Sequence, residues 1–292
     1  MLYIGSNVSF SKTMQLVGSV EETTKYKANT FMFYTVAPQN TMRYPLDKKL
    51  TDEAIEMMKN NGIEYSKLIV HAPYVVNLAN TEKLDFSTEF LIGEVNRCSE
   101  LGILNMVLHP GSHVGLGVDT AITNIITGLN KIIDNTKSVR ILLETMAGKG
   151  TEVGTDIDQL KRIIAGIKDK KRIGVCLDTC HLNDSGVDIS KFDEYLDEFD
   201  KEIGLSYIGC IHVNDSKNEI ASHKDRHANI GFGTIGFDNL IKVIYNERLG
   251  DIPRILETPY INHDYAPYKY EISMIRDKKF NKNIFDNIGN DD

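Results

Sequence analysis

The sequence predicts an α/β protein with the (β/α)8 TIM-barrel architecture. Short apolar runs rich in Val, Ile and Leu alternate with longer amphipathic stretches, a pattern typical of parallel strands covered by helices. The alternation repeats eight times, and a length of 292 residues suits one barrel of this kind. A doubly wound open sheet is the competing fold for the same alternation.

The predicted strands are almost continuously apolar, and most of them end at a polar residue followed by a turn former. A polar group at the end of a buried strand costs free energy unless something satisfies it, so these strand ends are candidate site positions. The predicted strands are residues 2–8, 30–34, 67–72, 106–109, 139–144, 173–178, 207–213 and 253–257.

Predicted helices fill the intervals between the strands, with apolar residues at helical spacing. They cover residues 15–28, 51–61, 87–101, 119–135, 156–168, 190–203, 236–247 and 268–278. No Ser/Gly-rich linker divides the chain, so we expect one barrel domain over residues 1–280. Residues 281–292 are polar and Asn-rich, and we expect them to form a frayed C-terminal tail.

Nine histidines and carboxylates lie at or just beyond the predicted strand ends. In a parallel barrel the carboxyl ends of all strands open onto one rim, where the active sites of such barrels lie. Six of the nine would close strands 3 to 8 in order, and three would lie in the loops after strands 6 and 7. The nine are His71, His109, Glu144, Asp178, His181, His212, Asp225, His227 and Glu257.

Each of these residues has a more ordinary interpretation when taken singly. A lone His at a strand end is more often a hydrogen-bonded polar residue than a ligand, and a lone Asp or Glu is more often a cap or an ion-pair partner. Gathered on one rim, however, so many charges would be prohibitively costly without cations. Imidazole and carboxylate ligands without thiolate suit Zn²⁺ and leave Mn²⁺ or Fe²⁺ open. The sequence therefore predicts a polynuclear metal centre.

The segment Asp225-Arg226-His227 is the clearest local group. In an extended segment residues two apart face the same way, so Asp225 and His227 can hold one ion while Arg226 points elsewhere. Asp178 and His181 are three apart across a strand-to-loop turn, so we expect them to diverge and to serve different ions.

The four cysteines, Cys98, Cys176, Cys180 and Cys210, show no spacing typical of a disulfide framework. Cys176 and Cys180 match the close cysteine pairs of structural zinc sites poorly. We therefore expect free thiols, buried or partly buried, in a reducing compartment.

Composition and charge limit the class of partner. Hydrophobic residues make up 41% and charged residues 25%, as in a globular protein with a sizeable core. No stretch approaches the roughly 18 apolar residues of a membrane span, and no basic region precedes an apolar one at the N-terminus, so we expect a cytoplasmic protein. The net charge of −8 disfavours broad DNA binding, but three divalent ions would change it to −8 + 6 = −2 and concentrate the positive field in one cleft.

The order of its motifs makes the chain resemble the endonuclease IV family of metal-dependent apurinic/apyrimidinic endonucleases. The resemblance covers nearly the whole chain. Its specificity lies in the combined order of HPG, DTCH, DRH and ILET, because each fragment alone is not specific. The matching segments are YIGSNVS, FMFYTVAPQNT, HAPYVVNLAN, VLHPGSHVG, LETMAGKGT, GVCLDTCHLNDSG, HVNDSKN, DRHANIGFG and ILETPY.

The resemblance implies a barrel that holds three zinc ions at the C-terminal rim of its strands. By this resemblance the ligands are His71 and His109 at the first ion, Glu144 bridging the first and second, Asp178, His212 and Glu257 at the second, and His181, Asp225 and His227 at the third. Asn7 departs from the pattern, because a His is expected at the end of the first strand.

The resemblance also implies residues that contact DNA. Tyr74 matches the tyrosine that the family inserts into the DNA stack, and its alternative is an aromatic packing on a helix at the rim. In the loop after strand 2 the family uses a side chain to fill the gap left by the extruded sugar. Here that loop reads APQNT, which makes Gln39 the candidate, followed by Asn40 and Arg43. Arg226, turned away from the ion, is a further candidate for contact with DNA.

The implied reaction is hydrolysis of the phosphodiester 5′ to an abasic site in double-stranded DNA by a monomeric enzyme. The products are a 3′-hydroxyl and a 5′-deoxyribose phosphate. Zinc lowers the pKa of bound water towards about 7, and Glu257 or Glu144 would be the catalytic carboxylate that orients the attacking hydroxide.

Two other functions are compatible with the same residues. A metal-dependent sugar isomerase or epimerase would use the same barrel and similar ligands, but two metals suffice for that chemistry. A non-catalytic, metal-stabilised DNA-binding module is disfavoured, because ligands at strand ends in a cleft suit an open catalytic site.

Overall fold

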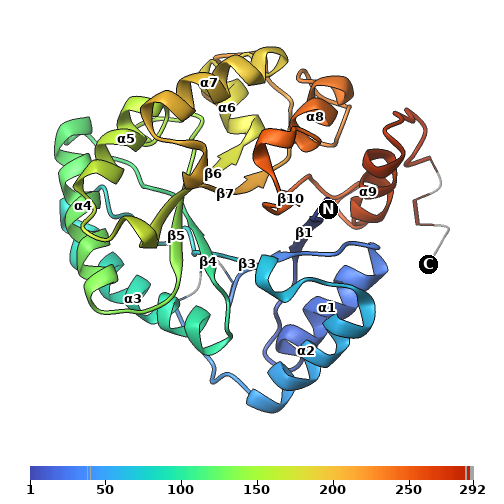
Figure 1. The fold of residues 1–292 in the computed structure, drawn as a ribbon, viewed down its shortest axis with the longest axis horizontal. Helices are drawn as coiled ribbons and strands as arrows, with labels where there is room; N and C mark the ends of the chain where they lie inside the picture. The colour runs from blue at the N-terminus through green and yellow to red at the C-terminus, as the bar shows by residue number, and fades with distance from the viewer. Residues whose placement is uncertain (38, 40, 287, 290–292) are drawn as a thin grey trace.

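The computed structural model describes residues 1–37, 39, 41–286 and 288–289. Within this part, eight parallel strands close a barrel in the order β1-β10-β7-β6-β5-β4-β3-β2. Helices surround the strands on the outside (Figure 1). The predicted (β/α)8 barrel is thus confirmed, and the doubly wound open sheet is wrong for this chain.

The barrel strands are short; four of the eight are buried at every residue, and each of the other four has a single partly buried residue. They are β1 (Ile4–Val8), β2 (Met32–Phe33), β3 (Ile69–His71), β4 (Asn105–Leu108), β5 (Arg140–Glu144), β6 (Ile173–Asp178), β7 (Ile208–His212) and β10 (Arg254–Leu256). Two further strands, β8 (Asp215–Ser216) and β9 (His227–Ala228), pair antiparallel in the loop after β7.

The helices lie close to their predicted positions. The α-helices of the described chain are α1 (Gln15–Lys25), α2 (Lys48–Asn61), α3 (Leu84–Glu100), α4 (Val118–Asp134), α5 (Ile157–Gly166), α6 (Thr179–Ser185), α7 (Phe192–Glu202), α8 (Phe237–Ile244) and α9 (Tyr268–Asp277). Short 3-10 helices are η1 (Tyr65–Lys67), η2 (Thr81–Lys83), η3 (Lys170–Arg172), η4 (Ile189–Lys191), η5 (Leu205–Tyr207) and η6 (Glu247–Leu249).

Local signals explain where these helices begin and end. In α2 the side chain of Asp47 accepts a hydrogen bond from the backbone N–H of Lys49, and the helix ends at Gly62 with φ at 66°. Helix α6, which the sequence reading missed, has only seven residues. Its cap is Asp178, the last residue of β6, so the strand and the helix follow each other without a loop.

Two layers of side chains fill the barrel towards the C-terminal ends of its strands. The inner layer is a buried apolar cluster of Met32, Ile69, Val107, Leu142, Cys176, Cys210 and Ile255. Successive residues of a strand point to opposite faces, so the residue two positions later on each strand also points inward, one layer nearer the C-terminal rim. Those residues are Tyr34, His71, His109, Glu144, Asp178, His212 and Glu257. The apolar layer is therefore the floor of the candidate site.

The described part of the C-terminal tail packs on the barrel. Ile284 contacts the hydrophobic core, and the ring of Phe285 lies 5.3 Å from that of Phe232. Ile284 and Phe285 thus have apolar partners on the barrel, although the composition of this segment is polar.

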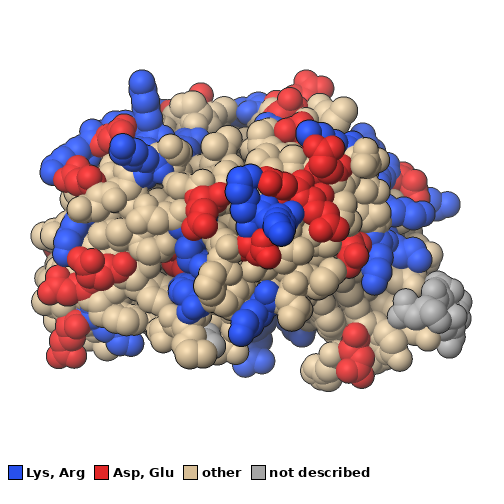
Figure 2. All heavy atoms as spheres, turned by 90° about the horizontal axis from the view of Figure 1, so that it is seen from below, with Lys and Arg blue, Asp and Glu red and all other residues tan. Residues whose placement is uncertain are grey.

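The outer surface carries charges of both signs. Figure 2 shows acidic and basic side chains interspersed over the side of the barrel that includes α2, without one continuous basic field on that face. None of the described helices has the length and apolar character needed to cross a membrane. The surface in this view offers no broad electrostatic site for a polyanion.

Candidate metal centre

All nine predicted ligands lie around the C-terminal rim of the barrel. Six of them come from the ends of β3 to β7 and β10, in the layer above the apolar floor. Subsets of three or four have ligand atoms within 4.8 Å of one another: His71, His109 and Glu144; Glu144, Asp178, His212 and Glu257; Asp178, His181 and His227. The structure therefore brings together residues up to 186 positions apart in the sequence.

Glu144 lies between two of these groups and presents a different oxygen to each. Its Oε2 lies 3.1 Å from Nε2 of His71 and 3.1 Å from Nε2 of His109. Its Oε1 lies 2.9 Å from Nδ1 of His212, whose Nδ1 is also 3.0 Å from Oε2 of Glu257. A carboxylate placed in this way has the geometry to bridge two cations.

The third group joins helix α6 to the loop after β7. Nε2 of His181 lies 3.0 Å from Oδ1 of Asp225, and Nε2 of His227 lies 3.4 Å from the same oxygen. Nε2 of His227 is also 3.9 Å from Oδ2 of Asp178, so the third group adjoins the second.

Two sequence-based expectations about this group are wrong. Asp225 is not extended, because its φ is 53°, so a turn and not strand alternation makes it converge with His227. His181 lies in the first turn of α6 and not in a loop. It does not diverge from Asp178, because Asp178 caps that helix and accepts a hydrogen bond from the backbone N–H of His181 at 2.8 Å.

Burial and opposite charge set the protonation of the centre. Burial raises the pKa of Glu144, but His212 and His109 beside it hold this pKa well below its usual value. Burial likewise opposes ionisation of Glu257, yet His212 lowers its pKa to about 2. For His227, burial lowers the pKa, but Asp225 and Asp178 raise it to about 9. The carboxylates therefore stay ionised and draw positive charge to the rim, as protons or as metal cations.

The residues present fit a divalent cation. Nε2 of His227 is buried 3.4 Å from Oδ1 of Asp225 and 3.9 Å from Oδ2 of Asp178, and it makes no well-aligned hydrogen bond among the described residues. Buried polar atoms in proteins normally have one, so such an orphan points to a ligand. A donor set of imidazoles and carboxylates suits zinc. All four cysteines are free and buried, as predicted.

Neighbouring groups that the sequence did not single out hold the candidate ligands in place. Asn214 donates from Nδ2 to Oδ2 of Asp178 at 2.7 Å and accepts from the backbone N–H of Glu257 at 2.9 Å. The carbonyl of Thr145 lies 2.8 Å from Nδ1 of His181. Asn214 follows a ligand by two residues in HVND, and that adjacency is the signal that could have identified it.

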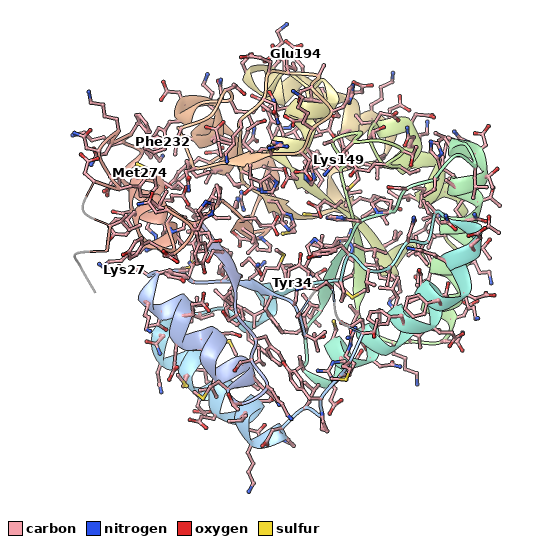
Figure 3. All side chains as sticks on the ribbon, turned by 180° about the vertical axis from the view of Figure 1, so that it is seen from behind. Lys27, Tyr34, Lys149, Glu194, Phe232 and Met274 are labelled. Carbon is pink, nitrogen blue, oxygen red and sulfur yellow. The ribbon has the colours of Figure 1, made fainter. Side chains whose placement is uncertain are left out.

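Tyr34 also belongs to the centre and was missed. Its ring centroid lies 5.0 Å from that of His71, and Figure 3 shows it near the middle of the ring of strands. Burial raises the pKa of Tyr34 well above its usual value, with Glu257 and Glu144 acting in the same direction, so the phenol keeps its proton. It directly follows strand β2, whereas the candidate ligands identified from the sequence begin at the end of β3.

The candidate DNA-contacting residues lie on the loops around this rim. Tyr74 is 56% exposed, and its hydroxyl lies 3.4 Å from Oε1 of Gln39, so two predicted DNA contacts from different loops adjoin. Asn40 lies outside the described residues. Arg226 is exposed between β8 and β9. Arg43 instead donates to the buried carboxylate of Glu94 on α3.

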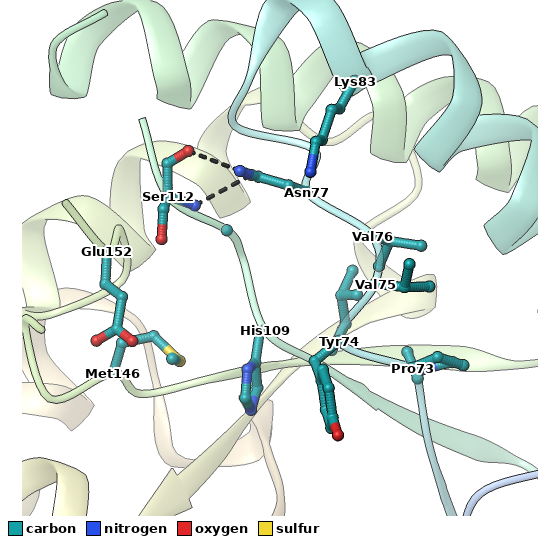
Figure 4. Close-up of a pocket in the computed structure, with 13 residues that line it drawn as sticks. Pro73, Tyr74, Val75, Val76, Asn77, Lys83, His109, Ser112, Met146 and Glu152 are labelled. Carbon is teal, nitrogen blue, oxygen red and sulfur yellow. Dashed lines mark hydrogen bonds between the residues drawn. The ribbon is translucent and has the colours of Figure 1, made fainter. Parts of the chain in front are cut away.

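A cavity of about 200 Å³ adjoins the centre between the loops after β3 and β4. His109 and Tyr74 line it on one side, and Asn77, hydrogen-bonded to Ser112, lines the other (Figure 4). The side chain of His109 is 34% exposed, against 2% for His71. The first group is thus open to solvent on this side.

Comparisons with known proteins agree with this geometry. The family model described as xylose isomerase-like TIM barrel matches residues 20–278. A protein of Acholeplasma laidlawii named probable endonuclease 4 is 53% identical over 289 residues, which is 97% of this chain and 98% of the relative. The crystal structure of endonuclease IV from Thermus thermophilus matches with a TM-score of 0.81 at 27% identity, covering 94% of this chain and 98% of that one.

A D-tagatose 3-epimerase-like protein matches with a TM-score of 0.70 at 20% identity, over 95% of this chain and 96% of that one. That likeness concerns the fold alone. The closed parallel barrel with clustered His and carboxylate side chains on its rim defines a TIM-barrel protein of the xylose isomerase-like class. Within this class, the sequence identity to the endonuclease 4 relative and the nearly full-length coverage of both chains decide the family. The chain belongs to the endonuclease IV family and is an endonuclease.

Proposed function

We propose that this endonuclease hydrolyses the phosphodiester 5′ to abasic sites in duplex DNA, with three zinc ions bound at the rim. The observation that carries the proposal is the position of Glu144 between His71 and His109 on one side and His212 on the other. Together with the adjoining third group, this arrangement supports a centre of three cations. Bound zinc would supply Lewis acidity and a nucleophilic hydroxide at neutral pH.

The protein's own residues divide the remaining work. The side chain of Glu257 is 17% exposed and that of Glu144 is 1% exposed, so Glu257 is the carboxylate that can reach and orient a water at the scissile phosphate. Glu144, closed off from solvent, keeps the first two groups at a fixed separation. Tyr74 and Gln39, which adjoin on the loops of the C-terminal rim, would insert into the duplex and fill the space left by the extruded sugar. An unpaired abasic nucleotide costs less to extrude than a paired base, which favours this substrate.

The state and location of the protein form part of the same proposal. We propose a monomer that acts in the cytoplasm, where reducing conditions keep thiols free. The free, buried state of all four cysteines supports this location.

A duplex with one tetrahydrofuran abasic mimic tests the activity. The zinc-loaded protein is expected to cut this duplex once, 5′ to the mimic, and to leave the undamaged duplex intact. Elemental analysis should find about three zinc ions per chain, and chelation should abolish cutting. Cleavage 3′ to the mimic, no cleavage by the fully metallated protein, or full activity in chelator with one ion or none bound would overturn the proposal.

The same samples separate the two alternatives. A sugar isomerase would interconvert an aldose and a ketose, an epimerase would invert one carbon of a sugar, and either would leave the duplex intact. A non-catalytic module would bind the abasic duplex tightly without cutting it. The third group of ligands favours the nuclease, because two metals suffice for sugar isomerisation.

A further inference from the structure

Asp184, on helix α6, is a completely buried carboxylate outside the nine candidate ligands. Its Oδ1 accepts hydrogen bonds from Oγ of Ser216 at 2.7 Å and from Nδ2 of Asn183 at 3.0 Å. Its Oδ2 accepts from Nδ2 of Asn218 and from the backbone N–H of Asp225, both at 2.9 Å. One side chain thus binds three positions of the segment between β7 and β9.

That segment needs external support, because its backbone is strained. Ala221, His223 and Asp225 have φ values of 61°, 55° and 53°, in the left-handed region. A residue with a side chain adopts this region only at a cost in free energy that glycine does not have. The backbone N–H of His223 donates to the carbonyl of Asp184 at 3.0 Å, so α6 supports the segment through its main chain as well.

The supported segment carries part of the candidate centre. Oδ1 of Asp225 lies 3.0 Å from Nε2 of His181. His181 and Asp184 are both on α6, three residues apart. The hydrogen bond to the backbone N–H of Asp225 therefore fixes the position of Asp225 relative to the helix that carries its neighbour. His227 follows two residues later, at the start of β9.

We infer that Asp184 is a positioning residue for the third metal ion, because it fastens the loop that bears Asp225 and His227 to the helix that bears His181. This inference rests on the proposed function. A carboxylate is required because only it offers lone pairs on both oxygens for donors on both sides. An Asn at this position keeps the shape of the side chain but replaces one acceptor oxygen with an NH2 group. That donor would then face another donor, the hydroxyl of Ser216 or the side-chain amide of Asn218.

The variant Asp184→Asn tests the inference in the zinc-loaded, full-length protein. We expect it to keep two zinc ions with the affinity of the wild type and to bind the third 10–100-fold more weakly in chelator competition, the usual loss when a group supporting a ligand is removed. Metal-depleted Asp184→Asn should also be cut faster by trypsin after Lys224 and Arg226. Thermal melting checks that the variant is folded.

Asp215→Asn is the matched control. Asp215 is also a buried carboxylate. Among the described residues its hydrogen bonds come from backbone N–H groups, including those of Gly231, Gly233 and Ile235 in the loop after β9, and not from a candidate ligand. It should keep three ions with wild-type affinity. Three ions of wild-type affinity in Asp184→Asn, or an equal loss of all three ions, would overturn the inference. Fewer than three ions in the wild type would instead count against the proposed function.

Discussion

Arg43 donates from Nε to Oε1 of Glu94 at 2.5 Å and so ties the loop after β2 to helix α3. Glu94 is completely buried, and its other oxygen accepts from the hydroxyl of Thr35 at 2.8 Å. The guanidinium of Arg43 also lies 4.2 Å over the ring of Phe90. One buried carboxylate therefore holds both ends of the loop that bears Gln39.

Loosening this anchor should weaken DNA binding without changing the chemistry. In Glu94→Gln the charge-assisted bond from Arg43 becomes a neutral one, a loss of about 1–2 kcal/mol. We expect KM for an abasic duplex to rise about 5–30-fold, with kcat and zinc content unchanged. Steady-state kinetics with Glu100→Gln, near the exposed end of α3, as the control would show this. A fall in kcat at constant KM would contradict it.

Removing the solvent-accessible carboxylate should separate binding from cleavage. In Glu257→Gln the side chain keeps its shape but loses the negative charge that orients water, so kcat should fall about 10²–10⁴-fold. Binding of the abasic duplex, measured by fluorescence anisotropy, should remain within a few-fold of the wild type. Glu247→Gln, at an exposed site on η6, is the control. Turnover like the wild type would remove Glu257 from the reaction.

Tyr74 should contribute through contact with DNA bases. Its ring is exposed at the mouth, and a base stacked on an aromatic ring is worth about 1–3 kcal/mol. We therefore expect Tyr74→Ala to raise KM about 5–100-fold at unchanged stability. Phe86→Ala removes a comparably exposed ring, 49% against 56%, from the outer helix α3 and should leave KM unchanged. Equal effects in the two variants would contradict a specific role for Tyr74.

Glu271, on α9, should make stability depend on pH. Burial raises its pKa to about 7, although Thr258, the Ile230 N–H and Asn229 donate hydrogen bonds to it. Because the folded protein binds this proton more tightly than the unfolded chain, the stabilisation is fully present below about pH 4.5 and is lost as the pH rises through about 7.

Urea unfolding at pH 5 and pH 8 checks this expectation. Between pH 5 and pH 8 the free energy of unfolding of the wild type should fall by about 2–3 kcal/mol more than that of Glu271→Gln, because the amide has no proton to release. Glu219→Gln, at an exposed position, should behave as the wild type does. An identical pH dependence in wild type and Glu271→Gln would mean that Glu271 does not titrate in this range.

The sequence located most elements because their signals are local. Apolar runs marked the strands, and helical spacing marked the helices to within a few residues. Helix α6 was missed because it has only seven residues and follows β6 without a loop. A segment this short shows no clear helical spacing of apolar residues. Tyr34 was missed because a tyrosine at a strand end is common, and only the tertiary structure shows that its ring lies beside that of His71.

The sequence by itself determined the barrel, the kinds of side chain on its rim and their order, since each depends on a pattern within a few residues. Only the tertiary structure decided that Glu144 presents one oxygen to His71 and the other to His212, and that Arg43 is bound to Glu94. These contacts join residues more than fifty positions apart. Their geometry depends on how strands and helices pack, and no local pattern encodes it.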